Sequence, residues 1–174
     1  HARAKCDLRP GEPFDEAQHQ RLAIGVGQAK DARQRAAGGI ARFDGIRFAT
    51  FETAAAPELT SRPIFGFMED TDGNLWVSHS RGAALYRDGR FSPAFDSALT
   101  DGRRVWAFAQ GADGVVWAAS ENGLLRWEKG KGVTKVFKEA DGLPTLRLRS
   151  LAFDRDGTLW IGTTGGGLVT YAGG

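Results

Sequence analysis

The sequence is short of cysteine, of long apolar runs and of charge of one sign. Its single cysteine, Cys6, excludes an internal disulfide and leaves the compartment open. No stretch approaches the roughly 18 to 20 apolar residues that span a bilayer, and the N-terminus lacks the hydrophobic core of a signal peptide. A net charge of +2 is too small to favour a nucleic acid or a membrane surface as a partner.

Motifs of enzyme chemistry are also missing. The chain contains no G-x-S-x-G, no H-E-x-x-H and no G-x-x-x-x-G-K-[ST] sequence. Its histidines, His1, His19 and His79, are scattered, and we expect His79 to be a solvated loop residue. Residues 70–73 and 154–157 only faintly resemble calcium loops, because the downstream acidic ligand is absent, and turn formation explains them better. We predict no catalytic residue, no metal site and no cofactor.

Glycine, in contrast, is abundant, with 24 residues, and it marks a repeat. An Asp-Gly pair precedes each of Trp76, Trp117 and Trp160, which lie 41 and 43 residues apart. The same intervals separate the glycines found six residues after each tryptophan, which are Gly82, Gly123 and Gly166. A period just above 40 residues with several short strands per unit is typical of a β-propeller blade.

The residues around each tryptophan predict antiparallel strands. Asp-Gly favours a tight hairpin, since glycine adopts positive φ freely. Leu75 and Val77 alternate with Trp76 and Ser78, so both faces of the strand are largely apolar, as in a sheet between two neighbours. The expected strands are 63–69, 74–79, 83–87 and 90–95, then 104–110, 115–120, 124–128 and 133–139, and finally 148–154, 159–163 and 168–171.

The last copy resembles the two-component regulator propeller repeat, found in sensor regions of bacterial hybrid histidine kinases and related regulators. The resemblance rests on Asp-Gly-Leu-Pro at 141–144, an apolar strand at 151–153, the run at 154–163 and Gly-Gly-Leu at 166–168. The earlier copies depart from it, with Ser-His at 78–79 and Ala-Ser at 119–120 in place of Gly-Thr. The resemblance implies a role in signal transduction and a periplasmic or extracytoplasmic location.

We therefore predict an all-β fold, a partial β-propeller of about three four-stranded antiparallel blades plus a fragment of a preceding blade. The expected units are the end of a blade at 39–58, blades at 59–100 and 101–141, and an incomplete blade at 142–174. Closed propellers have about four to eight blades. We therefore expect a piece of a longer protein, whose remaining blades and signalling domains would be partners.

Residues 1–38 do not follow the repeat and stay unassigned. Arg33 stands where a tryptophan is expected, and the composition of residues 15–37 allows a helix, but Leu22, Ile24 and Val26 form no apolar stripe. We interpret this segment as disordered or as a poorly packed helix. A boundary artefact, such as a shifted reading frame, is our hypothesis for it.

Candidate ligand-binding residues lie near the first strand of each unit. Arginines recur 13 or 14 residues before each tryptophan and could line the mouth of the central channel: Arg62, Arg103, Arg104 and Arg147. The guanidinium group suits carboxylate, sulfate or phosphate. The alternative is solvated ion pairs with Asp70, Asp101 or Asp141. Loops on the same face add polar residues suited to a sugar-like ligand, which are His79, Arg81, Glu121, Asn122 and Thr164.

Two classes of function remain. The favoured one is a non-catalytic sensory or interaction propeller that binds a small anionic or carbohydrate ligand, with no contact to nucleic acid or membrane. The alternative is part of an enzyme propeller, either a virginiamycin-type lyase or a polysaccharide-active enzyme. A lyase would need a catalytic histidine and acidic metal ligands on one face, where the sequence offers only His79.

Overall fold

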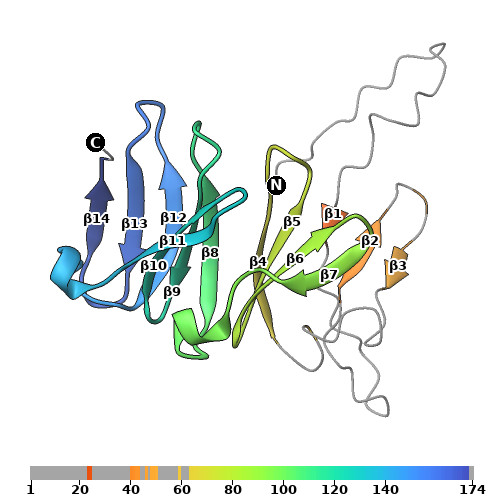
Figure 1. Cartoon of the computed structure of the whole chain (residues 1–174), viewed down its shortest axis with the longest axis horizontal. Helices are drawn as coiled ribbons and strands as arrows, with labels where there is room; N and C mark the ends of the chain where they lie inside the picture. The colour runs from red at the N-terminus through yellow and green to blue at the C-terminus, as the bar shows by residue number, and fades with distance from the viewer. Residues whose placement is uncertain are drawn as a thin grey trace, which may run out of the picture.

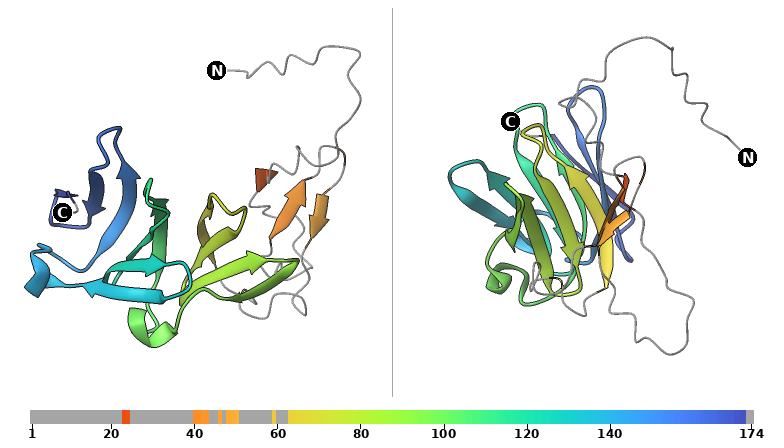
Figure 2. Two further views of the ribbon diagram at one scale, coloured as in Figure 1. Left: turned by 45° about the horizontal axis from the view of Figure 1, so that its top comes forward. Right: turned by 90° about the vertical axis from the view of Figure 1, so that its right-hand side faces the viewer.

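The computed structural model describes residues 23–24, 40–43, 46, 48–50, 59 and 63–172. These residues form antiparallel sheets of three or four strands that follow one another along the chain (Figure 1). Figure 2 shows the sheets succeeding one another from one end of the molecule to the other. The all-β propeller architecture expected from the repeats is confirmed.

Each sheet is a meander, in which consecutive strands pair. The first contains β1 (Ala23–Ile24), β2 (Ala41–Phe43) and β3 (Phe48–Thr50). The second contains β4 (Ile64–Glu69), β5 (Leu75–His79), β6 (Gly82–Arg87) and β7 (Arg90–Pro93). The third contains β8 (Val105–Gln110), β9 (Val116–Ser120), β10 (Gly123–Glu128) and β11 (Gly132–Phe137). The fourth contains β12 (Leu148–Phe153), β13 (Leu159–Thr163) and β14 (Leu168–Tyr171). Short 3-10 turns, η2 (Ser97–Thr100) and η3 (Glu139–Asp141), lie in the linkers between sheets.

All eleven strands expected between residues 63 and 171 are present, and their ends differ from the prediction by no more than two residues. The Asp-Gly turns have the expected backbone, since Gly73, Gly114 and Gly157 have φ of 79°, 78° and 82°. Within residues 39–58, the expected end of a blade, β2 pairs antiparallel with β3. Turns and strand periodicity depend on residues close together in the chain, so the sequence alone predicts them well.

The interpretation of the N-terminal segment as disordered or helical is wrong at one point. Ala23 and Ile24 form strand β1, which pairs antiparallel with β2. Leu22, Ile24 and Val26 alternate with period two, which is the period of a strand, so the sequence did contain an indication of this strand. Arg33, the residue at the expected tryptophan position, lies outside the described residues.

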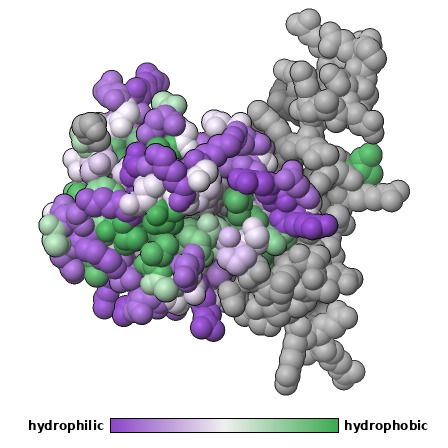
Figure 3. Space-filling model, in the orientation of Figure 1, coloured by the Kyte–Doolittle hydropathy of each residue, from purple (hydrophilic) through white to green (hydrophobic). Residues whose placement is uncertain are grey.

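Tryptophans fill the space between successive sheets. Trp76 is fully buried and lies 4.9 Å from the ring centroid of Trp127 and 5.7 Å from that of Phe108, both in the next sheet. Trp117 packs in the same way on Tyr171 of the last sheet, at 5.2 Å. Trp160, in the last sheet, is 39% exposed. Figure 3 shows apolar side chains gathered over the third and fourth sheets, bordered by hydrophilic residues.

Candidate ligand site on the innermost strands

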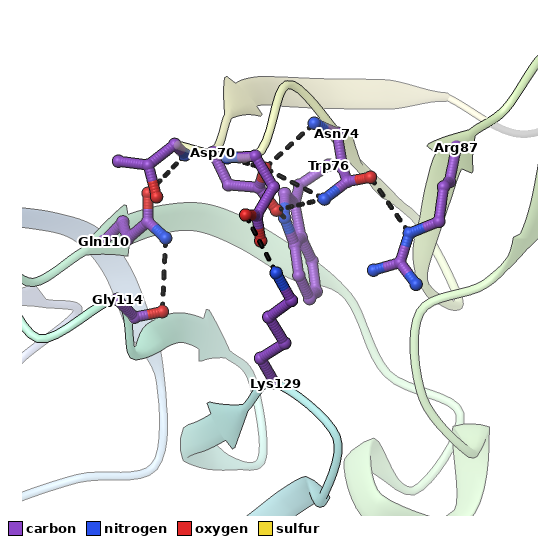
Figure 4. Close-up of polar contacts among 9 residues, drawn as sticks. Asp70, Asn74, Trp76, Arg87, Gln110, Gly114 and Lys129 are labelled. Atoms are coloured by element: carbon purple, nitrogen blue, oxygen red, sulfur yellow. Dashed lines mark hydrogen bonds and ion pairs between the residues drawn. The ribbon is translucent and has the colours of Figure 1, made fainter.

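The two faces of the propeller segment use their polar residues differently. On the face with the Asp-Gly turns, the Asp70 carboxylate accepts hydrogen bonds from Trp76 Nε1 at 2.9 Å and from the backbone and side chain of Asn74 (Figure 4). Burial raises the pKa of Asp70, but these hydrogen bonds outweigh it and hold the pKa below its usual value. These bonds agree with the interpretation of residues 70–73 as a turn.

Neighbouring sheets are also linked on this face. The backbone N–H of Thr71 donates to Gln110 Oε1 at 2.8 Å, and Lys129 Nζ lies 2.9 Å from Asp72 Oδ1 (Figure 4). Residues 154–157 repeat the arrangement, because Asp154 accepts from Trp160 Nε1 at 2.7 Å. Carboxylates engaged in this way hold turns and tryptophans in place.

Each innermost strand contains one residue at which its pairing with the second strand shifts. The register breaks around Phe65 in β4, Trp106 in β8 and Arg149 in β12. These positions are equivalent, because each lies eleven residues before the tryptophan of its own blade. A β-bulge bends the strand and redirects a side chain, and bulges are frequent beside binding sites. Three successive blades therefore redirect the same position.

The bulged side chains meet across the blades, because β8 contacts both β4 and β12. The rings of Phe65 and Trp106 are 4.5 Å apart, and the guanidinium carbon of Arg149 lies 4.0 Å from the Trp106 ring centroid. The guanidinium carbon of Arg104 lies 5.6 Å from the same centroid and 5.8 Å from that of Phe65. Cations at such distances are attracted by the aromatic face.

Two residues from neighbouring turns hold Arg149. Its Nε donates to Thr164 Oγ1 at 2.7 Å, and its Nη1 lies 3.6 Å from Glu121 Oε1. We name the set Phe65, Arg104, Trp106, Glu121, Arg149 and Thr164 the Arg–Trp cluster. It lies at the starts of the innermost strands, on the face opposite the Asp-Gly turns.

The cluster contains an unsatisfied donor. Trp106 Nε1 is buried and has no hydrogen-bond partner, and it is the one such side-chain atom among the described residues. Buried polar groups in native proteins are nearly always paired, so an exception calls for a physical explanation. Arg104, in contrast, is an exposed residue, and no residue of the described ranges forms an ion pair with its guanidinium.

The predicted arginines divide between the two alternatives. Arg104 belongs to the Arg–Trp cluster, whereas Arg103 forms a solvated pair with Asp101 at 3.3 Å. Arg147 is exposed, and its backbone carbonyl accepts from the Thr164 N–H at 2.8 Å. Arg62 lies outside the described residues.

The remaining residues that the sequence suggested for the site, or as ion-pair partners of its arginines, make different contacts. Asp141, expected as a partner for arginine, pairs instead with Lys135 at 2.8 Å. Glu121 and Thr164 join the cluster through Arg149. The N–H of Asn122 donates to Ser120 Oγ at 3.0 Å and serves the turn.

Sequence reasoning missed Phe65, Trp106 and Arg149. Their shared offset of eleven residues from the blade tryptophan was visible, but their residue types differ from blade to blade. A repeat is recognised from positions that keep one residue type in every copy. This position carries Phe, Trp and Arg in the three blades, so it does not stand out in the sequence. The register break that redirects them becomes visible only once the strands are paired.

His79 and Arg81 line a cleft of their own. The prediction that His79 is a solvated loop residue is wrong, because it is 3% exposed and its Nδ1 accepts from the Arg81 N–H at 3.2 Å. Both residues line a cleft of ≈ 360 Å³ beside the linker that follows β7. The remaining lining residues are Gly82, Ala83, Pro93, Phe95, Asp96 and Ser97.

Among the described residues, no three His, Cys, Asp or Glu side chains are grouped closely enough to hold a metal ion. In the same part of the chain, no helix has the length and apolar character needed to cross a membrane.

Comparison with known families identifies the repeats. Residues 58–81 and 142–165 match the family described as two component regulator propeller. At these two segments the chain is similar to two component regulator propeller repeats. Each match covers the first two strands of a blade, β4–β5 and β12–β13, including the bulged residues Phe65 and Arg149. No curated protein matches the sequence.

Solved structures share the fold of these regulator propeller repeats. The extracellular domain of a putative hybrid two component system from B. thetaiotaomicron has a TM-score of 0.65 and 22% identity over 78% of this chain and 18% of its own. PorZ, a surface component of the type-IX secretion system of Porphyromonas gingivalis, has a TM-score of 0.56 and 17% identity over 79% of this chain and 20% of its own.

An enzyme shares the fold as well. Virginiamycin B lyase from Staphylococcus aureus has a TM-score of 0.55 and 16% identity over 76% of this chain and 48% of its own. The chain therefore spans less than half the length of each of these three proteins. At these identities the likeness is one of fold, the β-propeller.

Proposed function

We propose that this chain is a non-catalytic, ligand-sensing or interaction segment of an extracytoplasmic signal-transduction protein, and that the Arg–Trp cluster is its binding site. The observation that carries the proposal is the redirection of Phe65, Trp106 and Arg149 at one equivalent position of three successive blades.

The surroundings of the site support the same role. The cluster combines two guanidinium groups with two aromatic rings on rigid strands, and rigid scaffolds place binding residues well. Arginine and aromatic residues are also enriched at the centres of protein interfaces. The family match and the extracellular domain of a hybrid two component system among the similar structures favour a signalling protein and an extracytoplasmic location. Signalling domains and further blades of the same polypeptide would be its partners.

The proposal is tested by asking whether the chain binds a small molecule without converting it. The full chain is mixed with a panel of small organic acids, acidic sugars and neutral sugars, and thermal unfolding and tryptophan fluorescence are recorded. We expect at least one compound to raise the unfolding midpoint, to bind Arg149→Met more weakly and to be recovered unchanged. Arg155→Met is the matched control, because Arg155 is an exposed arginine of the same blade on the opposite face.

The enzyme alternative predicts another outcome. Virginiamycin B lyase shares the fold, so virginiamycin B itself is included in the panel. If mass spectrometry shows that virginiamycin B is consumed in the presence of the chain, the enzyme propeller would be favoured. Equal binding of every compound to wild type and Arg149→Met would place the ligand elsewhere than in the Arg–Trp cluster.

A further inference from the structure

Three tryptophans of the chain have indole nitrogens whose environments can be compared. Trp76 Nε1 donates to Asp70, and Trp160 Nε1 donates to Asp154. Trp106 Nε1 is buried in the Arg–Trp cluster without a partner. Trp76 and Trp160 thus both donate to a carboxylate, one in a buried and one in a partly exposed environment, whereas Trp106 has no such acceptor among the described residues.

The charge around Trp106 is suited to such an acceptor. Arg104 and Arg149 both approach its ring, at 5.6 and 4.0 Å, and Nε1 is an atom of that ring. Glu121 lies 3.6 Å from Arg149 and offsets one of the two positive charges. Arg104 has no anionic partner in the described ranges, so the cluster retains about one net positive charge.

We infer that the Arg–Trp cluster binds the carboxylate group of a small organic acid, with Trp106 Nε1–H and the Arg104 guanidinium as donors. This inference rests on the proposed function and names the ligand class of that site. A carboxylate carries one negative charge, which matches the cluster, whereas phosphate carries about −1.5 to −2 at pH 7. The rings of Phe65 and Trp106 provide the apolar surface that the organic part of the ligand contacts.

Arg149 has a positioning role in this site. Its guanidinium is held by Thr164 and Glu121, and it covers the Trp106 ring. It therefore keeps the indole in one orientation and adds positive potential. Trp106 and Arg104 donate directly to the ligand. Unlike Arg149, neither has a hydrogen-bond or ion-pair partner for its side chain among the described residues.

The experiment uses benzoate as the probe and benzamide, its uncharged counterpart, as the control compound. Thermal unfolding and calorimetric titration are recorded for the full chain, Trp106→Phe, Arg104→Met and Arg155→Met. Trp106→Phe removes the N–H but keeps an aromatic ring, and it deletes a donor that has no partner. Because the smaller ring also loses part of the contact with Phe65 and Arg149, the unfolding midpoint of each variant without ligand is the reference for its shift with ligand.

Benzoate should raise the midpoint of wild type and of Arg155→Met. In Trp106→Phe and Arg104→Met, we expect the Kd for benzoate to be weaker by about tenfold or more, the usual effect of removing a hydrogen bond to a charged group. Benzamide should bind at least about tenfold more weakly than benzoate. Inorganic phosphate and sulfate, measured alongside, should bind more weakly than benzoate.

Other outcomes would overturn the inference in distinguishable ways. Stronger binding of phosphate or sulfate than benzoate would reject the carboxylate and leave an anion site. Equal binding of benzamide and benzoate, lost in Arg104→Met, would reject an anionic ligand while the proposed function stands. Benzoate binding that is equal in all four proteins, or absent from all of them, would reject the carboxylate site altogether.

Discussion

Trp76 Nε1 donates a 2.9 Å hydrogen bond to Asp70 Oδ2, and the same bond joins Trp160 to Asp154 at 2.7 Å. The bond ties the Asp-Gly turn of a blade to the tryptophan that covers its neighbour. In the middle blade Gly111 replaces the aspartate, and Trp117 relies on contacts with Phe137 and Tyr171. Similar turns therefore coexist with different anchoring of the tryptophan.

The first prediction concerns Asp70 and pH. Its pKa is lower in the folded chain than the usual 3.8, so its ionised form stabilises the fold above that value, and the contribution is lost as pH falls through the folded-state pKa. Asp70→Asn should lower the free energy of unfolding by about 1 to 3 kcal/mol at pH 7, because buried donors lose their acceptor. The difference from wild type should shrink below about pH 4.

Chemical unfolding at pH 7, 5, 4 and 3 measures this effect. Asp156→Asn is the control, because Asp156 is exposed in the equivalent turn and its side chain accepts none of the bonds made by Asp154. A difference between wild type and Asp70→Asn that stays constant from pH 7 to 3 would contradict the role assigned to the ionised carboxylate.

The second prediction compares two tryptophans. Trp117 is 5% exposed and packs on Phe137 and Tyr171, so Trp117→Ala should lower the free energy of unfolding by about 3 to 5 kcal/mol. Trp160 is 39% exposed, and Trp160→Ala should cost clearly less. Thermal unfolding of both variants is the measurement. Equal shifts would show that Trp160 is covered in solution, or that the blades are divided wrongly.

The third prediction concerns the glycine that follows each blade tryptophan by six residues. Gly123 has φ of 108°, and an added Cβ would lie 2.2 Å from the Phe137 carbonyl oxygen. Gly114 also has positive φ, 78°, but an added Cβ would meet nothing within 4 Å. Gly114→Ala should therefore cost about 1 kcal/mol for backbone strain alone, and Gly123→Ala substantially more. The measurement is the free energy of unfolding of the two variants. Equal losses in both would rule out a steric contribution at Gly123.

The fourth prediction concerns association. Trp160 and Leu168 lie on one face of the last sheet, since Leu168 pairs with Gly162, two residues from Trp160, and they are 39% and 64% exposed. We expect residues 39–174 expressed alone to self-associate through such open faces. Light scattering should show a smaller species for Leu168→Lys than for wild type, with Ala112→Lys, at an exposed residue in the Asp-Gly turn of the middle blade, as control. A sharp monomer with a cooperative melt in wild type would mean that the segment is self-sufficient.

The blade pattern was readable from the sequence because it depends on neighbours in the chain. Alternating apolar residues predict a strand, and Asp-Gly predicts the turn, so strands β4 to β14 lie where the repeat placed them. The tryptophan interval likewise identified the unit that stacks. These features need only local backbone preferences and a repeated apolar face.

The choice of site residues was decided by the tertiary structure. Arg104 and Arg103 are adjacent in sequence, yet Arg104 approaches Trp106 while Arg103 pairs with Asp101. Both precede β8, and the bulge at Trp106 changes which side chains converge there. Phe65, Trp106 and Arg149 meet only because three innermost strands, more than 40 residues apart in sequence, lie side by side. The sequence by itself determined the blades and their order, and the pairing of strands across them decided which side chains meet at the Arg–Trp cluster.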